Sequence, residues 1–526
     1  MIRIRQIKVS VLENQEEKIP KKIMQLLKIK EKELVSYRIH KKSIDARNKN
    51  IILFVYEIDV EVLEEEKIIE RTSSKDIFVV KETPYEFPKG NHKIERPIIV
   101  GSGPAGLFCA YMLAEAGTNP IIFERGDSME NRIQSVEKFF KENVLDPESN
   151  IQFGEGGAGT FSDGKLNTLT KDSQGRNKKV FEIFVENGAP EEILYIHNPH
   201  IGTDILRKVI VNMRKKIKSM GGDFHFRSCV TNLILEEGCI KGVEINHNQI
   251  YSSSHVVLAV GHSARDTFEL LDRLGINMKP KNFAVGLRIE HPREMIDAWQ
   301  YGKFASILGS ASYKLTYQTK TGRGVYSFCM CPGGYVVNAS SEEKRLVVNG
   351  MSNYDRKERN SNSAIVVTVT PNDFGNELFA GMKFQRKLEE LAYQEGKGLI
   401  PVQLLGDFYN NKTSTAYQEI IPNTKGKTCF GNLRTILPEF VSSSIMEAMP
   451  NFSKKIKGFD REDAILLGVE TRTSSPIVIV RNEDLESSIK GLYPCGEGAG
   501  YAGGITTASV DGIKVAEKIV LSHDKI

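Results

Sequence analysis

The feature that most constrains this fold is a glycine-rich turn that follows a short apolar run. Ile98–Val100 has the character of a buried strand, and the segment Gly101–Gly106 (GSGPAG) follows it directly. In such a turn Gly101 permits the tight bend, Gly103 lets the backbone approach a pyrophosphate, and Gly106 lets the next helix pack closely against the strand. The sequence therefore predicts a strand, a phosphate-binding turn and a helix over residues 98–114.

The residues after this turn extend the same unit. The helix over 107–114 would point its unpaired N–H groups at the phosphates, and Gly117 ends it. A second strand at 120–123 finishes at Glu124, where a carboxylate can bind the two hydroxyls of a ribose. Strand, turn, helix, strand and acid together predict a nucleotide cofactor, and NAD, NADP and FAD all remain open at this point.

A second glycine cluster lies near the C-terminus. The apolar run 491–495 leads into Gly496 and Glu497, and a helix of small residues begins at Gly504–Ile505. This arrangement puts Glu497 near a pyrophosphate or a sugar-alcohol chain, and aims the helix N–H groups at a ring oxygen that gains negative charge on reduction. The alternative is a purely structural helix N-terminus. Two such turns so far apart favour one long cofactor that spans both, which points to FAD.

Composition narrows the class of protein. A chain of 526 residues, 40% hydrophobic and 26% charged, is long enough for two to four domains. Seven scattered cysteines give no disulfide framework, so we expect reduced thiols and a cytoplasmic location. The N-terminus lacks an uninterrupted apolar region, and no apolar run approaches the roughly 18–20 residues that span a bilayer. We therefore expect neither a secretory signal nor a membrane partner.

Basic residues concentrate at 18–49, a segment that contains eleven basic and three acidic side chains. One interpretation is a surface that binds RNA or another anion. The other is the solvated face of a small domain. The second is favoured, because Tyr37 is the only aromatic residue there that could stack on a base.

The chain divides by pattern into three parts. Residues 1–93 predict a small α/β domain, with strands at 2–12, 34–44 and 51–63 and a helix at 20–27, as in a ferredoxin-like fold; residues 82–97 form a linker. Residues 94–280 and 466–526 predict a discontinuous Rossmann-like, FAD-binding domain with three layers and a mainly parallel sheet. Residues 281–465 predict an inserted β-rich α+β domain that covers the substrate side.

Several motifs taken together resemble a known family. The segments 101–106, Glu124-Arg125, 258–264 and 496–505 are similar to FAD-dependent oxidoreductases of the glutathione-reductase-like superfamily. Three further strings, 153–166, 329–334 and 468–476, resemble the bacterial uncharacterised FAD-dependent dehydrogenase, or NAD(FAD)-utilising dehydrogenase, group. The resemblance covers nearly the full chain, including the basic segment with residues 42–47.

The resemblance implies which residues hold FAD. It places the first glycine turn at the pyrophosphate, Glu124 at the adenosine ribose, Val230 beside the adenine and the helix after Gly504 at the pyrimidine edge of the flavin. Glu497 stands where the broader superfamily commonly has Asp. The implied cofactor-binding residues are Gly101, Gly103, Pro104, Ala105, Gly106, Glu124, Arg125, Gly157, Gly159, Val230, Gly261, Gly496, Glu497, Gly504, Ile505 and Thr506.

Candidate catalytic residues follow a glycine-rich loop and a late strand. Asp163 and Lys165 come after the loop 154–164, and a lysine near the flavin could stabilise a reduced anion or relay a proton. The alternative is a surface turn with solvated charges. Glu470 and Arg472 alternate along one face, and either bind a charged substrate or form a structural ion pair.

Other chemistry-bearing residues have an open assignment. His262 and Arg265 fit a helix cap or surface role as well as a cofactor role. Cys329 and Cys331 fall on one face of a strand, where a redox pair is conceivable but two buried small residues are the more common case. No second Cys/His pair is spaced to complete a zinc site, so we expect no metal.

Only one full dinucleotide fingerprint is present, because 322–324 lacks the third glycine and the strand–helix frame. Either NAD(P)H binds transiently without its own domain, or an organic substrate reduces the flavin directly. The sequence thus predicts an FAD-dependent oxidoreductase that transfers a hydride between FAD and a small organic substrate. A flavin-dependent RNA-modifying or RNA-associated protein and a non-catalytic redox-sensing module are the alternatives. Oligomeric state is left open.

Overall fold

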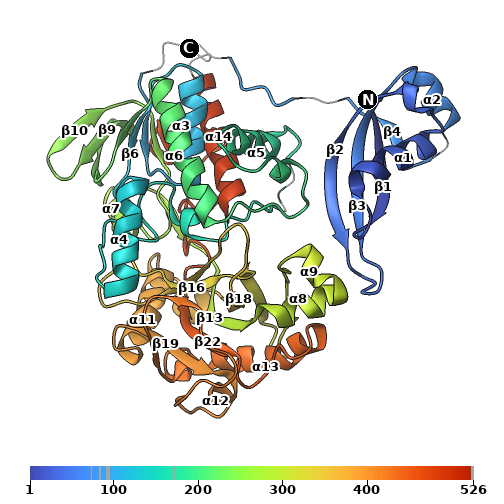
Figure 1. Ribbon diagram of the computed structural model, residues 1–526. Helices are drawn as coiled ribbons and strands as arrows, with labels where there is room; N and C mark the ends of the chain where they lie inside the picture. The colour runs from blue at the N-terminus through green and yellow to red at the C-terminus, as the bar shows by residue number, and fades with distance from the viewer. Residues whose placement is uncertain (73, 82–83, 90–94, 169, 171, 523–526) are drawn as a thin grey trace.

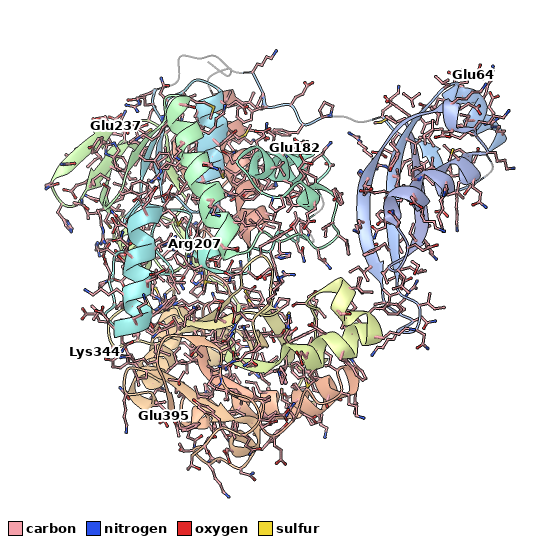
Figure 2. All side chains as sticks on the ribbon, in the orientation of Figure 1. Glu64, Glu182, Arg207, Glu237, Lys344 and Glu395 are labelled. Carbon is pink, nitrogen blue, oxygen red and sulfur yellow. The ribbon has the colours of Figure 1, made fainter. Side chains whose placement is uncertain are left out.

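The computed structural model describes residues 1–72, 74–81, 84–89, 95–168, 170 and 172–522. Three sheet-based parts follow one another along the chain, and the N-terminal part stands beside the other two (Figure 1). Side chains fill the space between sheets and helices, and exposed charged residues such as Glu64, Glu237 and Lys344 point outward (Figure 2). None of the helices described is long and apolar enough to cross a bilayer.

The N-terminal part is a four-stranded antiparallel sheet in the order β2-β3-β1-β4. Alternation places Ile2 and Ile4 of β1 in the core, against Ile58 and Val60 of β3. The order and the βαββαβ succession are those of a ferredoxin-like fold, as expected. The elements are β1 (Ile2–Ser10), α1 (Gln15–Leu27), β2 (Leu34–Asp45), β3 (Leu53–Val62), α2 (Glu65–Arg71) and β4 (Ile77–Val79).

The second part has three layers around a parallel sheet in the order β24-β11-β5-β6-β7. Ile99 packs toward helices α3, α6 and α14, whereas Ile98 and Val100 pack toward the three-stranded sheet β10-β9-β8 on the other face. The predicted three-layer, mainly parallel fold is confirmed.

The elements of this part are β5 (Ile98–Val100), α3 (Pro104–Glu115), β6 (Ile121–Phe123), α4 (Met129–Glu142), α5 (Arg176–Glu186), α6 (Thr203–Ser219), β7 (Asp223–His225), β8 (Val230–Glu236), β9 (Cys239–Ile245), β10 (Gln249–Ser252), β11 (Val256–Leu258), α7 (Arg265–Arg273), β24 (Leu492–Pro494) and α14 (Ile505–Ser522). Helices α3, α6 and α14 run side by side in front of the sheet (Figure 1).

The third part is built on a seven-stranded sheet in the order β14-β15-β18-β13-β22-β19-β21. Its principal elements are β13 (Phe283–Pro292), α8 (Arg293–Tyr301), α9 (Ala305–Leu308), β14 (Thr316–Gln318), β15 (Gly324–Cys331), β18 (Asn360–Val369), α11 (Ala380–Glu395), β19 (Ile400–Leu404), β21 (Thr428–Phe430), α13 (Glu439–Lys455) and β22 (Ile465–Glu470). A smaller sheet pairs β16 (Tyr335–Asn338) with β17 (Val348–Met351) and β20 (Thr424–Lys425).

The predicted boundary at 465/466 differs from the structure by one strand. β22 pairs with β13 and β19 inside the seven-stranded sheet, so residues 465–470 lie in the inserted part. The chain returns at β23 (Ile477–Ile479), which pairs with β12 (Met278–Pro280). These two strands join the second and third parts.

The N-terminal part contacts both neighbours. The Lys42 N–H donates to the Tyr195 carbonyl at 2.7 Å, and the His197 N–H donates to the Lys42 carbonyl at 2.9 Å. The ammonium of Lys49, in the β2–β3 loop, lies 3.7 Å from the ring centroid of Trp299 on α8. Of the predicted linker 82–97, residues 82–83 and 90–94 lie outside the described residues, while the Tyr85 hydroxyl donates to Glu517 at 2.6 Å.

Candidate functional site

The first glycine turn separates glycines that the fold needs from glycines that leave space. A Cβ on Gly101 would lie 2.7 Å from the Ala259 carbonyl oxygen, and one on Gly106 would overlap the Gly101 carbonyl oxygen. A Cβ on Gly103 would meet only the Gly157 Cα, at 3.8 Å. Gly103 therefore leaves the N-terminus of α3 approachable, as the phosphate-binding prediction requires. Pro104 and Ala105 follow it in the first turn of this helix.

Glu124 follows β6 directly, and its side chain forms hydrogen bonds with the first glycine turn and with two neighbouring loops. Its buried carboxylate accepts hydrogen bonds from the Ser102 N–H at 2.9 Å and hydroxyl at 2.8 Å, from the Gly126 N–H at 2.9 Å and from the Gly154 N–H at 3.0 Å. Four protein donors occupy the oxygens that the ribose prediction assigned to the cofactor. The structure therefore shows Glu124 tying three loops together, and the ribose contact stays a prediction.

Two other residues predicted to bind the cofactor contact protein in this structure. Arg125 donates to Asp266 at 2.5 Å and to the Cys229 sulfur at 3.0 Å, and its guanidinium lies 4.6 Å from the Phe153 ring centroid. Val230 is buried at the start of β8, within the core against the parallel sheet. The predicted start of a strand at Val230 is confirmed, and the cofactor contacts of Arg125 and Val230 stay predictions.

The glycine-rich loop 154–166 lies against the first turn. A Cβ on Gly157 would meet the Gly103 Cα at 3.0 Å, and one on Gly159 would meet Ile505 of α14 at 3.1 Å. The Thr506 hydroxyl donates to the Leu166 carbonyl at 2.8 Å. The loop thus bridges the N-termini of α3 and α14, which the sequence analysis had linked only through the cofactor.

A buried arginine that the sequence analysis missed holds this loop. Arg132 of α4 donates to the carbonyls of Asn150 at 2.9 Å, Ile151 at 2.9 Å, Glu155 at 2.6 Å and Gly157 at 3.0 Å. Burial lowers its pKa to about 9. Its signal in the sequence was weak, because a single arginine on a polar helix usually faces solvent. Arg207, near the lower end of α6 in Figure 2, stacks on Phe161 in the same loop at 4.3 Å.

The C-terminal glycine cluster completes the site. A Cβ on Gly496 would lie 2.6 Å from the Ala105 Cβ, so the two predicted glycine turns touch. The Glu497 carboxylate lies in hydrogen-bond contact with the ring Nδ1 of His262, and also accepts from the His262 backbone N–H at 3.4 Å. Burial alone would raise the pKa of the Glu497 carboxylate. The contacts with His262 have the larger combined effect, so the pKa is lowered.

The open side of this cluster fits a dinucleotide. No heavy atom of the described residues lies within 4 Å of a Cβ placed on Gly261, Gly503 or Gly504. The buried Nε2 of His262 has no hydrogen-bond partner among those residues. Space over three glycines and an unpaired polar atom on the residue after Gly261 are what a phosphate and sugar-alcohol chain would use. The residues present therefore fit FAD.

Asp163 and Lys165 face the inserted part. Asp163 is fully buried, accepts from the Ser352 hydroxyl, and pairs with Arg356 at 2.5 Å. Burial raises its pKa, but Arg356 and Lys165 outweigh burial and the net pKa is lowered. The Lys165 ammonium lies 4.0 Å from the Asp163 carboxylate and is 28% exposed. Asp163 is an anchor for the loop, and Lys165 is the cation that remains accessible.

Glu470 pairs with an arginine that the sequence analysis did not single out. Arg288 of β13 donates to Glu470 at 2.9 Å, and both side chains are buried. Burial raises the pKa of Glu470 to about 7 despite this partner. The guanidinium of Arg288 also contacts the Cys331 sulfur at 3.7 Å. The pattern Leu-Arg-Ile-Glu inside a buried strand was the available signal, since charges there need partners.

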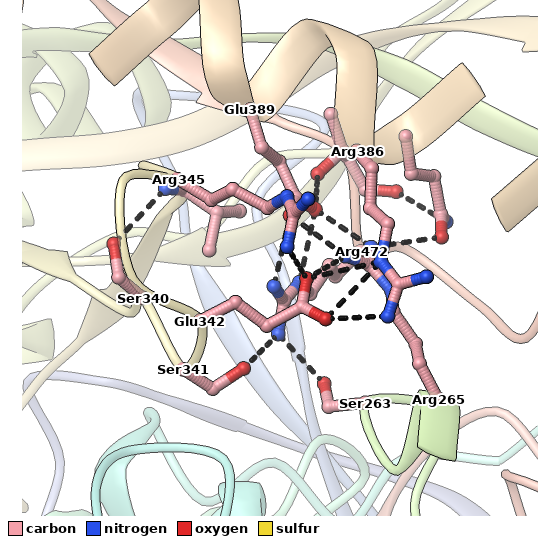
Figure 3. A network of polar contacts seen from close by, with 12 residues as sticks. Ser263, Arg265, Ser340, Ser341, Glu342, Arg345, Arg386, Glu389 and Arg472 are labelled. Carbon is pink, nitrogen blue, oxygen red and sulfur yellow. Dashed lines mark hydrogen bonds and ion pairs between the residues drawn. The ribbon is translucent and has the colours of Figure 1, made fainter. Parts of the chain in front are cut away.

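Arg472 belongs to a different cluster, so the predicted Glu470–Arg472 site is corrected. Arg472 makes two hydrogen bonds with Glu389, at 3.0 and 2.9 Å, and also donates to Ser263 and Ser341. Arg265 of α7 makes two further bonds to the same carboxylate at 2.9 Å (Figure 3). Arg472 and Arg265 are therefore structural at the junction between the second and third parts. The strand ends at Glu470, so alternation no longer applies to Arg472.

Family models match three regions of the chain. The family described as "FAD-dependent protein, C-terminal domain-like" matches residues 282–473, and "NAD(P)-binding Rossmann-like domain" matches 99–153. A domain of unknown function matches 1–61. Within the described residues, no group of three or more His, Cys, Asp or Glu side chains could hold a metal ion.

A curated relative covers the whole chain. An uncharacterised protein of Clostridium beijerinckii is 47% identical over 99% of this chain and 99% of its own length. Remote structural similarities include a flavin-dependent brominase, Bmp2 (11% identity, TM-score 0.38, 82% of this chain and 80% of that one), and L-proline dehydrogenase from P. horikoshii (14% identity, TM-score 0.33, 83% and 95%). On the family-model matches and the full-length relative, the chain belongs to a family of FAD-dependent oxidoreductases.

Proposed function

We propose that this protein is a dehydrogenase of the bacterial NAD(FAD)-utilising group, which transfers a hydride between FAD and a small organic substrate. The observation that carries the proposal is the Thr506–Leu166 hydrogen bond at 2.8 Å. It joins the helix expected at the flavin to the loop that presents Lys165. When bound, FAD supplies the two-electron chemistry.

The chain's own residues divide the remaining work. Gly103, Gly261 and Gly504 leave room for the dinucleotide backbone. Lys165 offers a partly exposed cation that binds an anionic substrate group or carries a proton, and Asp163 positions its loop. Glu470, with its raised pKa, can hold a proton near neutral pH. No second dinucleotide fingerprint stands in the sequence, so NAD(P)H binds transiently or the organic substrate supplies the hydride itself.

The location we propose is the cytoplasm. All seven cysteines of the chain are free thiols in the structure. Free thiols throughout a large chain suit a reducing compartment.

The first prediction concerns cofactor binding. Purified wild-type protein should be yellow with flavin absorbance, and Gly103→Val should lose the flavin because its side chain fills the phosphate approach. The flavin-free forms of both proteins should melt alike, within about 0.5 kcal/mol in stability, because only the Gly157 Cα lies near the new side chain. A colourless wild type that cannot be reconstituted with FAD would refute the cofactor site.

The second prediction concerns the reaction. Stopped-flow mixing with NADH, NADPH and a panel of organic reductants should identify a donor that bleaches the flavin absorbance. Lys165→Met should then slow that reduction by about 100-fold or more while FAD stays bound. Lys208→Met, an exposed change on α6, serves as the control and should react at the wild-type rate. A Lys165→Met protein that reacts as fast as wild type would remove Lys165 from the mechanism.

A further inference from the structure

Cys329 and Cys331 lie at a bulge in β15. The strand pairs with β18 so that Phe328 is opposite Ala364 and Cys331 is opposite Asn362, with a shift of register between them. Cys329 takes the left-handed backbone conformation, with φ of 44°. Such a conformation is uncommon for a residue with a side chain and often marks a functional position.

The bulge brings the two thiols together. In a regular strand, residues i and i+2 are about 6.6 Å apart at Cα, near the upper limit for a disulfide. The register shift at the bulge breaks this regular spacing, and the two thiols lie near enough for each to shift the pKa of the other. The Cys331 thiol also lies 3.4 Å from the Cys329 carbonyl oxygen. The Cys331 sulfur therefore lies directly beside Cys329.

The surroundings treat the two sulfurs differently. Cys331 is fully buried, whereas Cys329 is partly exposed. The hydrogen bond from Cys331 lowers the pKa of Cys329 to about 5, against the effect of burial, and Arg288 and Lys165 add to it. The same contact, together with burial, raises the pKa of Cys331. Cys329 is thus the thiolate on the more exposed residue and Cys331 the buried thiol beside it, an arrangement suited to thiol–disulfide exchange.

We propose that Cys329 and Cys331 are a redox-active pair that cycles between dithiol and disulfide by exchange with low-molecular-weight thiols and disulfides. The Cys329 thiolate attacks one sulfur of a disulfide RSSR, which forms a mixed disulfide and expels RS⁻. The Cys331 thiol gives its proton to that RS⁻, and its sulfur then attacks the Cys329 sulfur. The internal disulfide forms and the second RS⁻ leaves. The dithiol loses two electrons and RSSR gains them; two thiols RSH run the reaction in reverse.

This inference does not depend on hydride transfer, because the exchange needs neither flavin nor its substrate. It also differs from the reading of two buried small residues, which would leave both sulfurs inert. Cys239 offers a comparison within the same chain, since it is partly exposed on β9 and no other cysteine contacts it among the described residues.

The test uses the purified holoprotein in buffers of graded reduced and oxidised glutathione at pH 7. Free thiols are alkylated with iodoacetamide, and the tryptic peptide 324–344, which holds these two cysteines alone, is weighed. In oxidising buffer the wild-type peptide should carry no alkyl group and be lighter by two hydrogens than its dithiol form. In reducing buffer it should carry two alkyl groups. Cys331→Ser should instead give a Cys329–glutathione adduct.

Alkylation rates give a second readout. At pH 6 the native Cys329 should react about tenfold faster than Cys239, since a thiolate persists there. Cys239→Ser is the control and should leave the oxidation of peptide 324–344 unchanged. A peptide that stays doubly alkylated in every buffer, or that gains two separate glutathione adducts without an internal disulfide, would overturn the proposal. Because the readout is peptide mass, failure here and failure of flavin reduction are separate results.

Discussion

Two buried glutamates of the inserted part, Glu389 and Glu290, have pKa values shifted in opposite directions. Glu389 is clasped by two arginines, and they hold its pKa well below its usual range despite burial. Glu290 of β13 is equally buried, but its direct partner is the Asn423 N–H, at 3.2 and 3.0 Å from its two oxygens. Burial therefore raises the pKa of Glu290 to about 7. The same residue type thus carries opposite pH responses in one domain.

The third prediction follows from Glu290. Its folded pKa lies above its unfolded value of about 4.3, so the stability it contributes is present below pH 4.3 and is lost as pH rises through 7. At pH 8, Glu290→Gln should stabilise the protein by on the order of 1–3 kcal/mol relative to wild type, and its unfolding temperature should rise accordingly. At pH 5 the substitution should change the unfolding temperature much less. Scanning calorimetry at both pH values measures this, and exposed Glu294→Gln is the control. Equal shifts at pH 5 and pH 8 would contradict it.

At the scale of elements, two helices pack through glycine and alanine. A Cβ on Gly512 of α14 would overlap the carbonyl oxygen of Ala105 on α3. Helices α3 and α14 share a dense core with Ile513, Val515 and Leu113. Close approach here fixes both helix N-termini, and therefore both glycine turns, relative to each other.

The fourth prediction separates packing from cofactor space. Gly512→Ala should destabilise the flavin-free protein by about 1–3 kcal/mol, because the new methyl must push α14 away from α3. Gly503→Ala adds the same methyl where no described atom lies within 4 Å, and should melt with wild type. Thermal unfolding of the two flavin-free variants decides the matter. Equal melting temperatures for both variants would show that the helix contact adapts freely.

Local patterns foretold most elements, because strand alternation and glycine turns are short-range signals. Two predictions were wrong, one about where a helix begins and one about which residues form an ion pair. Pro20 suggested a helix start, but Asn14 caps the Glu16 N–H at 3.1 Å and α1 begins at Gln15. The partnership of Arg472 with Glu389, rather than Glu470, depends on α11, because Glu389 on that helix lies 83 residues earlier in the sequence. Tertiary contacts determine the partners in buried charge pairs of this kind, so the periodicity of the sequence does not indicate them.

At the scale of the whole molecule, a buried ion network fastens the parallel-sheet part to the inserted part. Arg265 comes from α7 of the former, while Glu389 and Arg386 come from α11 of the latter. Glu342 accepts from both Arg265 and Arg386, at 2.5 and 2.7 Å (Figure 3). Removal of one carboxylate from such a cluster leaves buried cations with too little counter-charge, which costs more than the pair itself contributes.

The fifth prediction compares two neighbouring glutamates of α11. Glu389→Gln should destabilise the protein by about 3–5 kcal/mol, because Arg265 and Arg472 lose their shared counter-charge. Glu390→Gln breaks only the partly exposed pair with Arg345 and should cost less than about 1 kcal/mol. Calorimetry should also show the unfolding of the two parts separating in Glu389→Gln. A Glu389→Gln protein as stable as Glu390→Gln would mean that the junction is held by other contacts.

The contact between Lys49 and Trp299 gives the molecule an optical reporter. Trp299 is the only tryptophan in the chain, and its indole N–H donates to the Lys455 carbonyl at 2.7 Å. All tryptophan emission therefore originates beside the hairpin loop of the N-terminal part. Departure of that loop would replace an ammonium by water over the indole ring and change the emission. Movement of the N-terminal part can thus be followed in unlabelled protein, in real time, while flavin absorbance records the redox state separately.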